Sequence, residues 1–277
     1  MKKYFWAAIV TAALVFSGRP ALAAETGNAK TELQALVGKI QLKLKDGKKT
    51  EAELSAELKE FDDLLARHKA EKTDDVAQIL LMKAMLYVQI FDDTDKGVKM
   101  FEQLKKDFPE TAPGKKADEI IASIKSQEGA KAIQRSLAVG VKFPDFAETD
   151  VAGKPMSVAS YKGKVVLVDF WATWCGPCVA ELPNVLSTYQ KNHPKGFEIV
   201  GISLDQDKQK LTDFTKSKNM SWQQFFDGKG WGNKLAVKYG VNSIPATFLL
   251  DGKGNIIGKD LRGEALDEAV TKALAKK

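Results

Sequence analysis

The sequence predicts an α/β domain with a central sheet flanked by helices, preceded by an all-α domain. Two patterns lead to this prediction. Residues 25–137 repeat apolar side chains at helical spacing and contain no convincing strand. From residue 138 onward, short apolar runs alternate with amphipathic stretches, as in a sheet that is covered on both faces. With 277 residues, the chain is long enough for each domain to bury its own core.

Residues 1–24 have the pattern of a signal peptide. Lys2 and Lys3 precede an apolar run over residues 5–16, and small residues follow before Ala24. The run spans about 12 residues, short of the roughly 20 that a membrane-spanning helix needs. We therefore expect cleavage near Ala23 or Ala24 and export to the periplasm, rather than a membrane anchor that stays in place.

The charge balance of the chain is mild once this leader is removed. Three of the 42 basic residues lie in it, so 39 remain against 36 acidic residues, and the net charge falls from +6 to +3. The remaining charges are spread over helices of mixed sign. We therefore expect no nucleic-acid partner.

The helical domain has clear helix signals but no group of chemically active side chains. Thr50 and Glu53 form a capping box ahead of a first apolar helical repeat. Three further helices are expected over residues 76–91, 98–108 and 117–124. Residues 91–124 resemble one degenerate tetratricopeptide-type (TPR-like) hairpin, although a small helical bundle explains the pattern as well. We expect this domain to bind a partner or to dimerise.

The second domain contains the apolar runs expected of buried strands. Strands are predicted over residues 165–171, 197–204, 247–250 and 256–257, and the last two form a hairpin. Helices are predicted over residues 178–192, 207–218, 231–239 and 264–275.

The two cysteines of the chain stand in a Cys-Gly-Pro-Cys sequence at residues 175–178. A disulfide that stabilises a fold closes a long loop, whereas a ring of four residues constrains the unfolded chain very little. This pair is therefore expected to do chemistry. A zinc site would need two more ligands, and the only histidines are His68 and His193. We expect neither a metal nor another cofactor.

The cysteines follow directly on a predicted buried strand, in the stretch from Val168 to Cys178. Here the chain resembles the thioredoxin superfamily, and the resemblance covers residues 138–277. The pattern Trp-Cys-x-Pro-Cys-x-x-Glu-x-Pro, from Trp174 to Pro183, is similar to that of the TlpA/ResA-like branch of exported thioredoxins. The resemblance implies a thioredoxin-like fold and a thiol–disulfide oxidoreductase, acting as a protein-disulfide reductase on protein thiols and disulfides.

The two cysteines are expected to have different roles because they differ in position along the predicted helix. Cys175 is expected at its exposed first turn, where free backbone N–H groups and the helix dipole stabilise a nucleophilic thiolate. Cys178 is expected to be more buried and to resolve the mixed disulfide, which closes the Cys175–Cys178 redox disulfide. Pro177 suits the first helical turn, whereas Pro183 lies inside the helix and is expected to kink it.

Two acidic residues are candidates for moving the proton of Cys178. Asp169 stands alone in an apolar strand, where burial raises the pKa of a carboxyl group. By resemblance to thioredoxins, Asp169 assists deprotonation of the buried cysteine. Glu181 either matches an acidic residue near the disulfide of TlpA/ResA-like proteins or is an ordinary solvated helix residue. The lysine that accompanies the aspartate in thioredoxins is missing, with Gly201 in its place.

The substrate-binding candidates lie on both sides of the cysteines. In thioredoxin-like folds the proline that corresponds to Pro245 follows a cis peptide bond and faces the cysteine pair. This leaves the backbone of Ile244 free to pair with an extended substrate. The alternative is an ordinary loop proline. We expect Trp174 to cover the disulfide, and Gly176 and Pro177 to lie at the contact with substrate. We expect Trp171 to serve partly in structural packing, and Trp222 and Trp231 to be core or surface packing residues with no assigned role.

A Gly-Pro dipeptide between the cysteines is found in reducing thioredoxins, whose potential is about −270 mV, against about −120 mV for strong oxidants. An exported reductant needs electrons from a membrane donor, which we expect as a second partner. A disulfide oxidase or isomerase-type exchanger, and an interaction protein with an accessory thioredoxin domain, remain alternatives. A peroxidase is disfavoured because a Pro-x-x-x-Thr-x-x-Cys element is absent.

Overall fold

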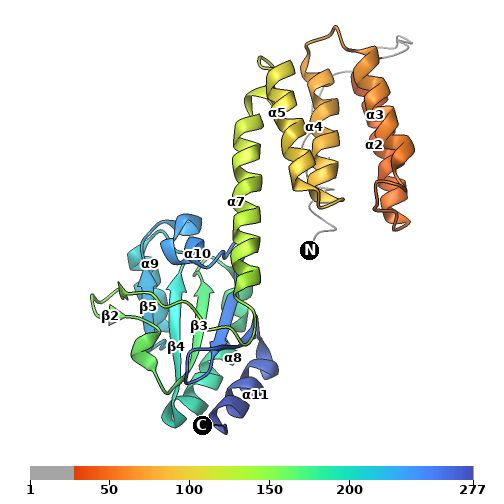
Figure 1. Ribbon diagram of the computed structural model, residues 1–277. Coiled ribbons are helices and arrows are strands. Elements are labelled where there is room, and N and C mark those ends of the chain that lie inside the picture. Colours follow the sequence, from red (N-terminus) through yellow and green to blue (C-terminus); the bar gives the residue numbers. More distant parts are fainter. Residues whose placement is uncertain (1–27, 277) are drawn as a thin grey trace. The chain divides into compact units, whose positions relative to one another are not determined.

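The structure, a computed structural model, describes residues 28–276. It divides into two compact units, the first ending at Lys125 and the second beginning at Ser126 (Figure 1). Helix α7 (Ala117–Ser136) crosses this limit, so the domain boundary expected at residue 138 stays a prediction. The predicted signal peptide, residues 1–24, lies outside the described residues.

The first unit consists of helices, as the sequence predicts. They are α2 (Ala29–Lys45), α3 (Ser55–Arg67), α4 (Asp74–Gln89), α5 (Thr94–Asp107), α6 (Ala112–Lys115) and the first part of α7. Asn28, Thr73 and Asp93 begin α2, α4 and α5 with side-chain caps. The predicted capping box forms just ahead of α3. Thr50 N–H donates to Glu53 Oε2 at 3.0 Å, and Glu53 N–H donates to Thr50 Oγ1 at 3.3 Å.

Helices α4 and α5 form a tight hairpin in this unit. At Gly97 of α5 an added Cβ would lie 2.3 Å from Val88 Cγ2, so a glycine is needed for the two helices to approach this closely. Leu36, Phe61 and Phe101 belong to the same core and are almost completely buried. The unit therefore has a helical core, whereas its resemblance to a TPR repeat stays a prediction.

The second unit is built on a mixed sheet with the strand order β5–β4–β3–β6–β7 in the described part of the chain. Four strands lie where the sequence predicts them: β3 (Val165–Trp171), β4 (Phe197–Ser203), β6 (Ala246–Leu250) and β7 (Ile256–Lys259). Strands β3, β4 and β5 (Gln223–Phe226) run parallel, and β6 runs antiparallel to β3. The sequence did not predict β5, nor the short hairpin of β1 (Glu148–Thr149) and β2 (Pro155–Met156), because these segments lack an apolar run.

Helices cover both faces of the sheet, as predicted. Helices α8 (Gly176–Asn192), α9 (Lys208–Ser217) and α11 (Gly263–Leu274) cover the face that carries Asp169 and Trp171. On that face the Trp171 ring meets Phe214 of α9 at a centroid distance of 5.7 Å. On the opposite face Phe170 meets Tyr239 at 6.0 Å, directly after α10 (Lys234–Lys238).

One helix prediction is wrong. The sequence predicts a single helix over residues 231–239, but the structure has a 3-10 turn, η3 (Gly230–Gly232), followed by α10. Asn233 separates the two. Its Oδ1 accepts the N–H groups of Leu235 and Ala236 and so begins a new helix.

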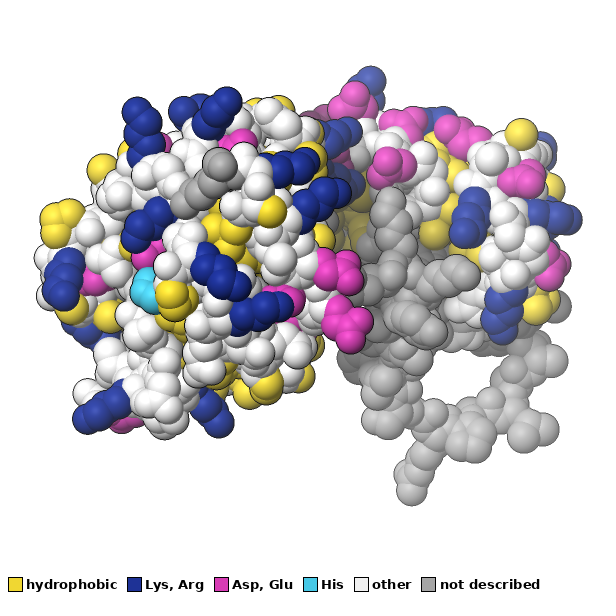
Figure 2. Space-filling view, turned by 90° about the horizontal axis from the view of Figure 1, so that it is seen from below, with side chains coloured by type: hydrophobic (Ala, Val, Ile, Leu, Met, Phe, Trp, Pro, Cys, Tyr) yellow, Lys and Arg dark blue, Asp and Glu magenta, His cyan; other side chains and the backbone are white. Residues whose placement is uncertain are grey.

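No helix within residues 28–276 has the length and apolar character that crossing a membrane requires. Figure 2 shows the face of the second unit at which β3 and β4 begin, where Lys and Arg side chains are scattered among neutral and hydrophobic ones. They do not gather into a single stripe on that face. The cysteine pair lies at the opposite edge of the sheet, where these strands end.

Candidate active site

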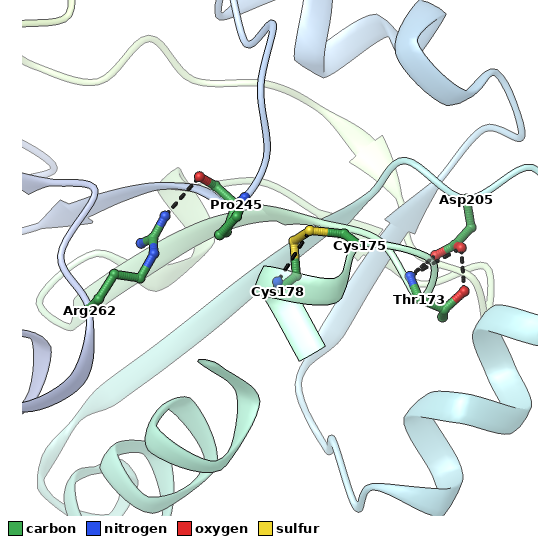
Figure 3. The surroundings of a disulfide bond; sticks show 6 residues. All are labelled: Thr173, Cys175, Cys178, Asp205, Pro245 and Arg262. Carbon is green, nitrogen blue, oxygen red and sulfur yellow. Dashed lines mark hydrogen bonds between the residues drawn. A yellow bond between two sulfur atoms is a disulfide. The ribbon is translucent and has the colours of Figure 1, made fainter. Parts of the chain in front are cut away.

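The cysteine pair lies where β3 ends and α8 begins. Cys175 is the N-cap residue of α8, and its Sγ accepts the N–H of Cys178 at 3.2 Å. The two residues form a disulfide with an S–S distance of 2.05 Å and a Cα–Cα distance of 5.2 Å (Figure 3). Gly176 and Pro177 form the exposed first turn of α8. The free N–H groups and the dipole at this helix end favour a thiolate on Cys175 once the disulfide is reduced.

The exposure of the two cysteines differs from the prediction. The sequence predicts an exposed Cys175 and a more buried Cys178, but only 5% of Cys175 and 7% of Cys178 is exposed. In this state the Cys175 sulfur is bonded to the Cys178 sulfur and accepts the Cys178 N–H of the first turn of α8. Position at the helix end, and not exposure, therefore distinguishes the two cysteines in this oxidised state.

Pro245 lies near the disulfide, where it lines the same small cavity as Cys178 (Figure 3). The Ile244–Pro245 peptide bond is cis, which confirms the prediction. Strand β6 begins one residue later, and its first pair with β3 joins Ala246 to Phe170. Within residues 28–276 no backbone hydrogen bond reaches Ile244, so its N–H and C=O are open to an extended segment.

Asp169 is buried within β3 and carries a raised pKa, as the sequence predicts. Burial raises the pKa of its carboxyl group to about 7, the charge of Arg262 lowers it and the charge of Glu181 raises it. Asp169, Glu181 and Cys178 line a cavity of about 20 Å³, measured as the space open to the centre of a water molecule, which is room for one water. A carboxyl group of this pKa can take up or release a proton near neutral pH beside Cys178.

Residues 138–274 match the family model described as Redoxin. A thiol-disulfide oxidoreductase ResA from Bacillus thuringiensis is 32% identical over 143 residues, which make up 52% of this chain and 80% of that protein. The chain belongs to the ResA family of thiol–disulfide oxidoreductases. The ResA protein of Bacillus subtilis is 30% identical over 124 residues, or 45% of this chain and 68% of the relative. The crystal structure of the thioredoxin domain of a thiol-disulfide oxidoreductase from Bacteroides vulgatus aligns with 34% identity over 50% of this chain and 98% of that one, with a TM-score of 0.46.

Membership of the ResA family makes this chain an enzyme of thiol–disulfide exchange. The predicted resemblance to the TlpA/ResA-like thioredoxins is thereby confirmed, together with the thioredoxin-like fold of the second unit. The whole of the helical first unit, which ends at Lys125, lies outside the Redoxin match, which begins at residue 138.

In this ResA-family chain Glu181 connects α8 to α11. Its Oε1 accepts the N–H of Gly263, the first residue of α11, at 2.6 Å, and its Oε2 accepts the amide N–H of Asn184 at 3.2 Å. The side chain is half-buried and lines the cavity with Asp169. The structure therefore places Glu181 near the disulfide, and also uses its negative charge to cap the N-terminus of α11.

The residue paired with Asp169 on β4 is Gly201, at the position where the thioredoxin lysine is missing. An added Cβ on Gly201 would lie 2.1 Å from Gln224 Oε1, so the Gln224 side chain occupies the space that a longer residue at 201 would need. A cation reaches the cavity from another element. Arg262, directly before α11, lines it, and sequence reasoning missed this residue because it lies far along the chain and belongs to no motif.

Asp205 is a second residue that sequence reasoning missed. It is buried two residues after the end of β4, and its carboxylate accepts the N–H of Thr173 at 3.1 Å, the Thr173 hydroxyl at 2.6 Å and the Ser203 hydroxyl at 2.7 Å. These bonds join the loop that leads into Cys175 to the end of β4 (Figure 3). Asp205 therefore positions the first turn of α8, and its only sequence signal is an acid at the end of a buried strand.

Trp174 and Trp231 form an exposed aromatic pair beside the site. Their ring centroids lie 6.0 Å apart in an edge-to-face arrangement, and 54% and 50% of the two residues is exposed. The turn that carries Trp231 is held by Asp227, whose carboxylate accepts the side-chain amide of Asn233 at 3.2 Å and the N–H of Lys234 at 2.9 Å. Trp171 and Trp222 are buried, as expected of packing residues, whereas Trp231 extends an apolar surface next to the cysteines.

Both histidines have partners away from the cysteine pair. His68 Nδ1 lies 2.8 Å from Glu71 Oε1 in the first unit, and His193 stacks on Tyr189. In the described range 28–276, no three residues among His, Cys, Asp and Glu are grouped so that they could hold a metal ion.

Proposed function

We propose that this ResA-family chain is a protein-disulfide reductase of the periplasm, recharged by a membrane electron donor. The observation that carries the proposal is the arrangement of the Cys175–Cys178 pair at the N-terminus of α8, beside cis-Pro245 and the buried Asp169. The Gly-Pro dipeptide between the cysteines supports the reducing direction, because reducing thioredoxins carry it.

The reaction begins with the dithiol form. The Cys175 thiolate attacks one sulfur of a substrate disulfide, forms a mixed disulfide and expels the other substrate sulfur as a thiolate. Asp169 then takes the proton of Cys178, whose thiolate attacks Cys175 Sγ. This step releases the second substrate thiolate and restores the Cys175–Cys178 disulfide. Two electrons pass to the substrate, its two thiolates take up protons, and the donor must return two electrons before the next cycle.

Substrate binding is assigned to the residues that surround the disulfide. The open backbone of Ile244, next to Pro245, pairs with an extended segment of the substrate protein, as a strand added to the edge of a sheet would. Gly176 and Pro177 contact the same segment. An added Cβ at Gly176 would meet no atom within 4 Å, so this side of the site leaves room for a substrate backbone. Trp174 contributes an apolar wall.

Glu181 is assigned a supporting role in proton transfer. It lines the cavity that holds Asp169 and Cys178, and its negative charge raises the pKa of Asp169. Burial and Glu181 raise this pKa and Arg262 lowers it, and the resulting value of about 7 suits proton exchange with the Cys178 thiol near neutral pH.

The proposed location rests on the leader-like residues 1–24, and the proposed role of the helical unit rests on a sequence without a cluster of nucleophiles or metal ligands. We assign that unit to binding a partner or to dimerisation. Sedimentation of the full-length mature protein, compared with a protein lacking residues 25–125, tests dimerisation through the helical unit.

The periplasmic location is tested separately. The mature protein should be recovered in a periplasmic fraction, with its N-terminus near residue 24 or 25.

The deciding experiment has two parts. Titration of the purified protein against a thiol buffer measures the reduction potential of the cysteine pair, and a value near about −270 mV supports a reductase. A value more than about 100 mV higher contradicts the reductase and favours the alternative, a disulfide oxidase or isomerase-type exchanger. In the second part, Cys178→Ala should trap a mixed disulfide between Cys175 and a disulfide-bonded peptide, and Cys175→Ala should trap none. The reverse pattern would contradict the assigned order of attack.

A further inference from the structure

Arg262 is the sole cation among the described residues that line the cavity of Asp169 and Cys178. It lies between β7 and α11 and is the N-cap residue of α11. The residue after it, Gly263, donates its N–H to Glu181 Oε1 at 2.6 Å, which fixes the backbone at this point against α8.

The guanidinium of Arg262 makes three hydrogen bonds that set its position. Nη2 donates to the carbonyl oxygen of Pro245 at 2.8 Å, and Nη1 donates to Thr247 Oγ1 at 3.0 Å and to its neighbour's carbonyl, Leu261 O, at 2.7 Å. Figure 3 shows Arg262 and Pro245 on one side of the disulfide and the Thr173–Asp205 pair on the other. One planar side chain thus holds the substrate-binding turn through two nitrogen atoms.

Thr247 connects this arrangement to Asp169. The two residues are directly paired across β6 and β3, so their side chains lie on the same face of the sheet as neighbours. The group that anchors the guanidinium is therefore the immediate neighbour of the carboxyl group that the proposed reaction uses as a base.

Within residues 28–276, the other elements packed around Asp169 supply no compensating positive charge. Strand β4 places Gly201 opposite it, and the Gln224 side chain that covers Gly201 is neutral. Helix α8 supplies Cys178, which is in the disulfide, and Glu181, whose negative charge opposes ionisation of Asp169. Arg262 alone favours the ionised form among these groups.

We propose that Arg262 is a positioning residue with two linked tasks: it supplies the cation that keeps Asp169 able to ionise, and it holds the Pro245 carbonyl so that the substrate-binding turn is pre-formed. The inference rests on the proposed role of Asp169 as proton acceptor. In this chain the cation comes from the loop before the last helix, whereas thioredoxins carry a lysine on the neighbouring strand.

The charge is tested by carbon-13 NMR of the aspartate carboxyl groups in the oxidised full-length mature protein, with Asp169→Asn identifying the signal. We expect Arg262→Gln to raise the titration midpoint of Asp169 by about one pH unit, since loss of a nearby cation disfavours the carboxylate. Arg262→Lys should keep the midpoint near the wild-type value. Arg135→Gln removes a guanidinium that does not line the cavity and should leave the midpoint unchanged. Equal midpoints in wild type and Arg262→Gln would overturn this half of the proposal.

The hydrogen bonds are tested by the KM for a short disulfide-bonded peptide. An ammonium group cannot bridge Pro245 and Thr247 as the guanidinium does, so Arg262→Lys should raise KM severalfold although it restores the charge. An unchanged KM in this variant would overturn the second half. If Arg262→Gln does not fold, Thr247→Val is used in its place. This substitution removes one hydrogen-bond acceptor of the guanidinium, so it should raise both the KM and the titration midpoint of Asp169. An unchanged KM together with an unchanged midpoint in Thr247→Val would contradict the proposal.

These measurements separate the inference from the proposed function. The NMR titration needs no substrate and no turnover, so it reports on Arg262 even if the chain is an oxidase. Conversely, a reduction potential outside the reducing range would contradict the proposed reductase function. The Asp169 midpoints of the Arg262 variants would still test the role of Arg262.

Discussion

Replacing Asp169 by asparagine should stabilise the oxidised protein at high pH and leave its stability at low pH nearly unchanged. Asparagine has the shape of the protonated carboxyl group but cannot ionise. The wild-type carboxyl group has a pKa of about 7 in the folded protein, against an ordinary value of 3.8. The folded state therefore binds this proton more tightly than the unfolded state does. The resulting stability is complete below about pH 4 and is lost as the pH rises through 7.

The magnitude follows from the size of the pKa shift. One pKa unit corresponds to 1.36 kcal/mol, so a rise from 3.8 to about 7 costs the wild type about 4 kcal/mol of unfolding free energy at pH 8. The difference between Asp169→Asn and wild type should thus grow from near zero at pH 4 to about 4 kcal/mol at pH 8.

The assay is urea unfolding of the oxidised wild type and variant at several pH values between 4 and 8. Every other titrating group is common to both proteins, so the difference isolates Asp169. Asp205→Asn is the matched control, because Asp205 is buried as well but accepts three hydrogen bonds. An amide there would place a donor against donors and should destabilise the protein by about 1–3 kcal/mol. A pH-independent difference between Asp169→Asn and wild type would contradict a raised pKa for Asp169 in the folded protein.

Three further substitutions test packing and surface roles. We expect Trp231, whose ring extends the exposed apolar surface of Trp174, to contact substrate as well. Trp231→Ala should therefore raise the KM for a disulfide peptide about threefold to tenfold and lower the unfolding free energy by no more than about 1 kcal/mol. An unchanged KM, as expected for Val237→Ala, would contradict this contact. Gly201→Ala should lower the free energy of unfolding in urea by about 1–3 kcal/mol, because its Cβ would displace Gln224 Oε1, which accepts the Trp171 Nε1–H at 3.0 Å. An unchanged unfolding free energy would show that the Gln224 side chain can move without loss. Gly240→Ala should destabilise the second unit in the same assay, because residue 240 has a φ of +63° and its Cβ would lie 2.5 Å from Ala130 O. The control Gly129→Ala, in α7, should be neutral or stabilising. Equal effects of the two substitutions on the unfolding free energy would contradict this account.

Several parts of the site could be predicted because their signals are local. The Cys-Gly-Pro-Cys sequence directly after an apolar strand predicts a redox pair at a helix N-terminus, and the structure places Cys175 there. Asp169 interrupts an apolar run, so its burial and raised pKa follow from the strand alone. The cis bond before Pro245 was predicted by resemblance rather than by physics, since no local pattern distinguishes it from a loop proline.

Other parts could not be predicted because they depend on which distant segments meet. Strand β5 contains two adjacent glutamines, and only pairing with β4 explains why Gln224 is buried. The expected helix over residues 231–239 is interrupted by the cap at Asn233, which in turn exposes Trp231 beside Trp174. The order of exposure of the cysteines was predicted for two separate thiols, whereas the structure holds both sulfurs in one disulfide and buries both residues.

The order of residues is enough to indicate the chemistry of this protein, because two cysteines stand in a ring too small to stabilise a fold, at the junction of a predicted buried strand and a helix, near a lone acid in that strand. The charges and the burial that set the pKa of that acid depend on the fold. Neighbouring strands bring Gly201 and Thr247 to Asp169, and the loop before α11 brings Arg262 to the same cavity. The physical reason is that a pKa depends on charges and burial in space, which the order of residues along the chain does not specify.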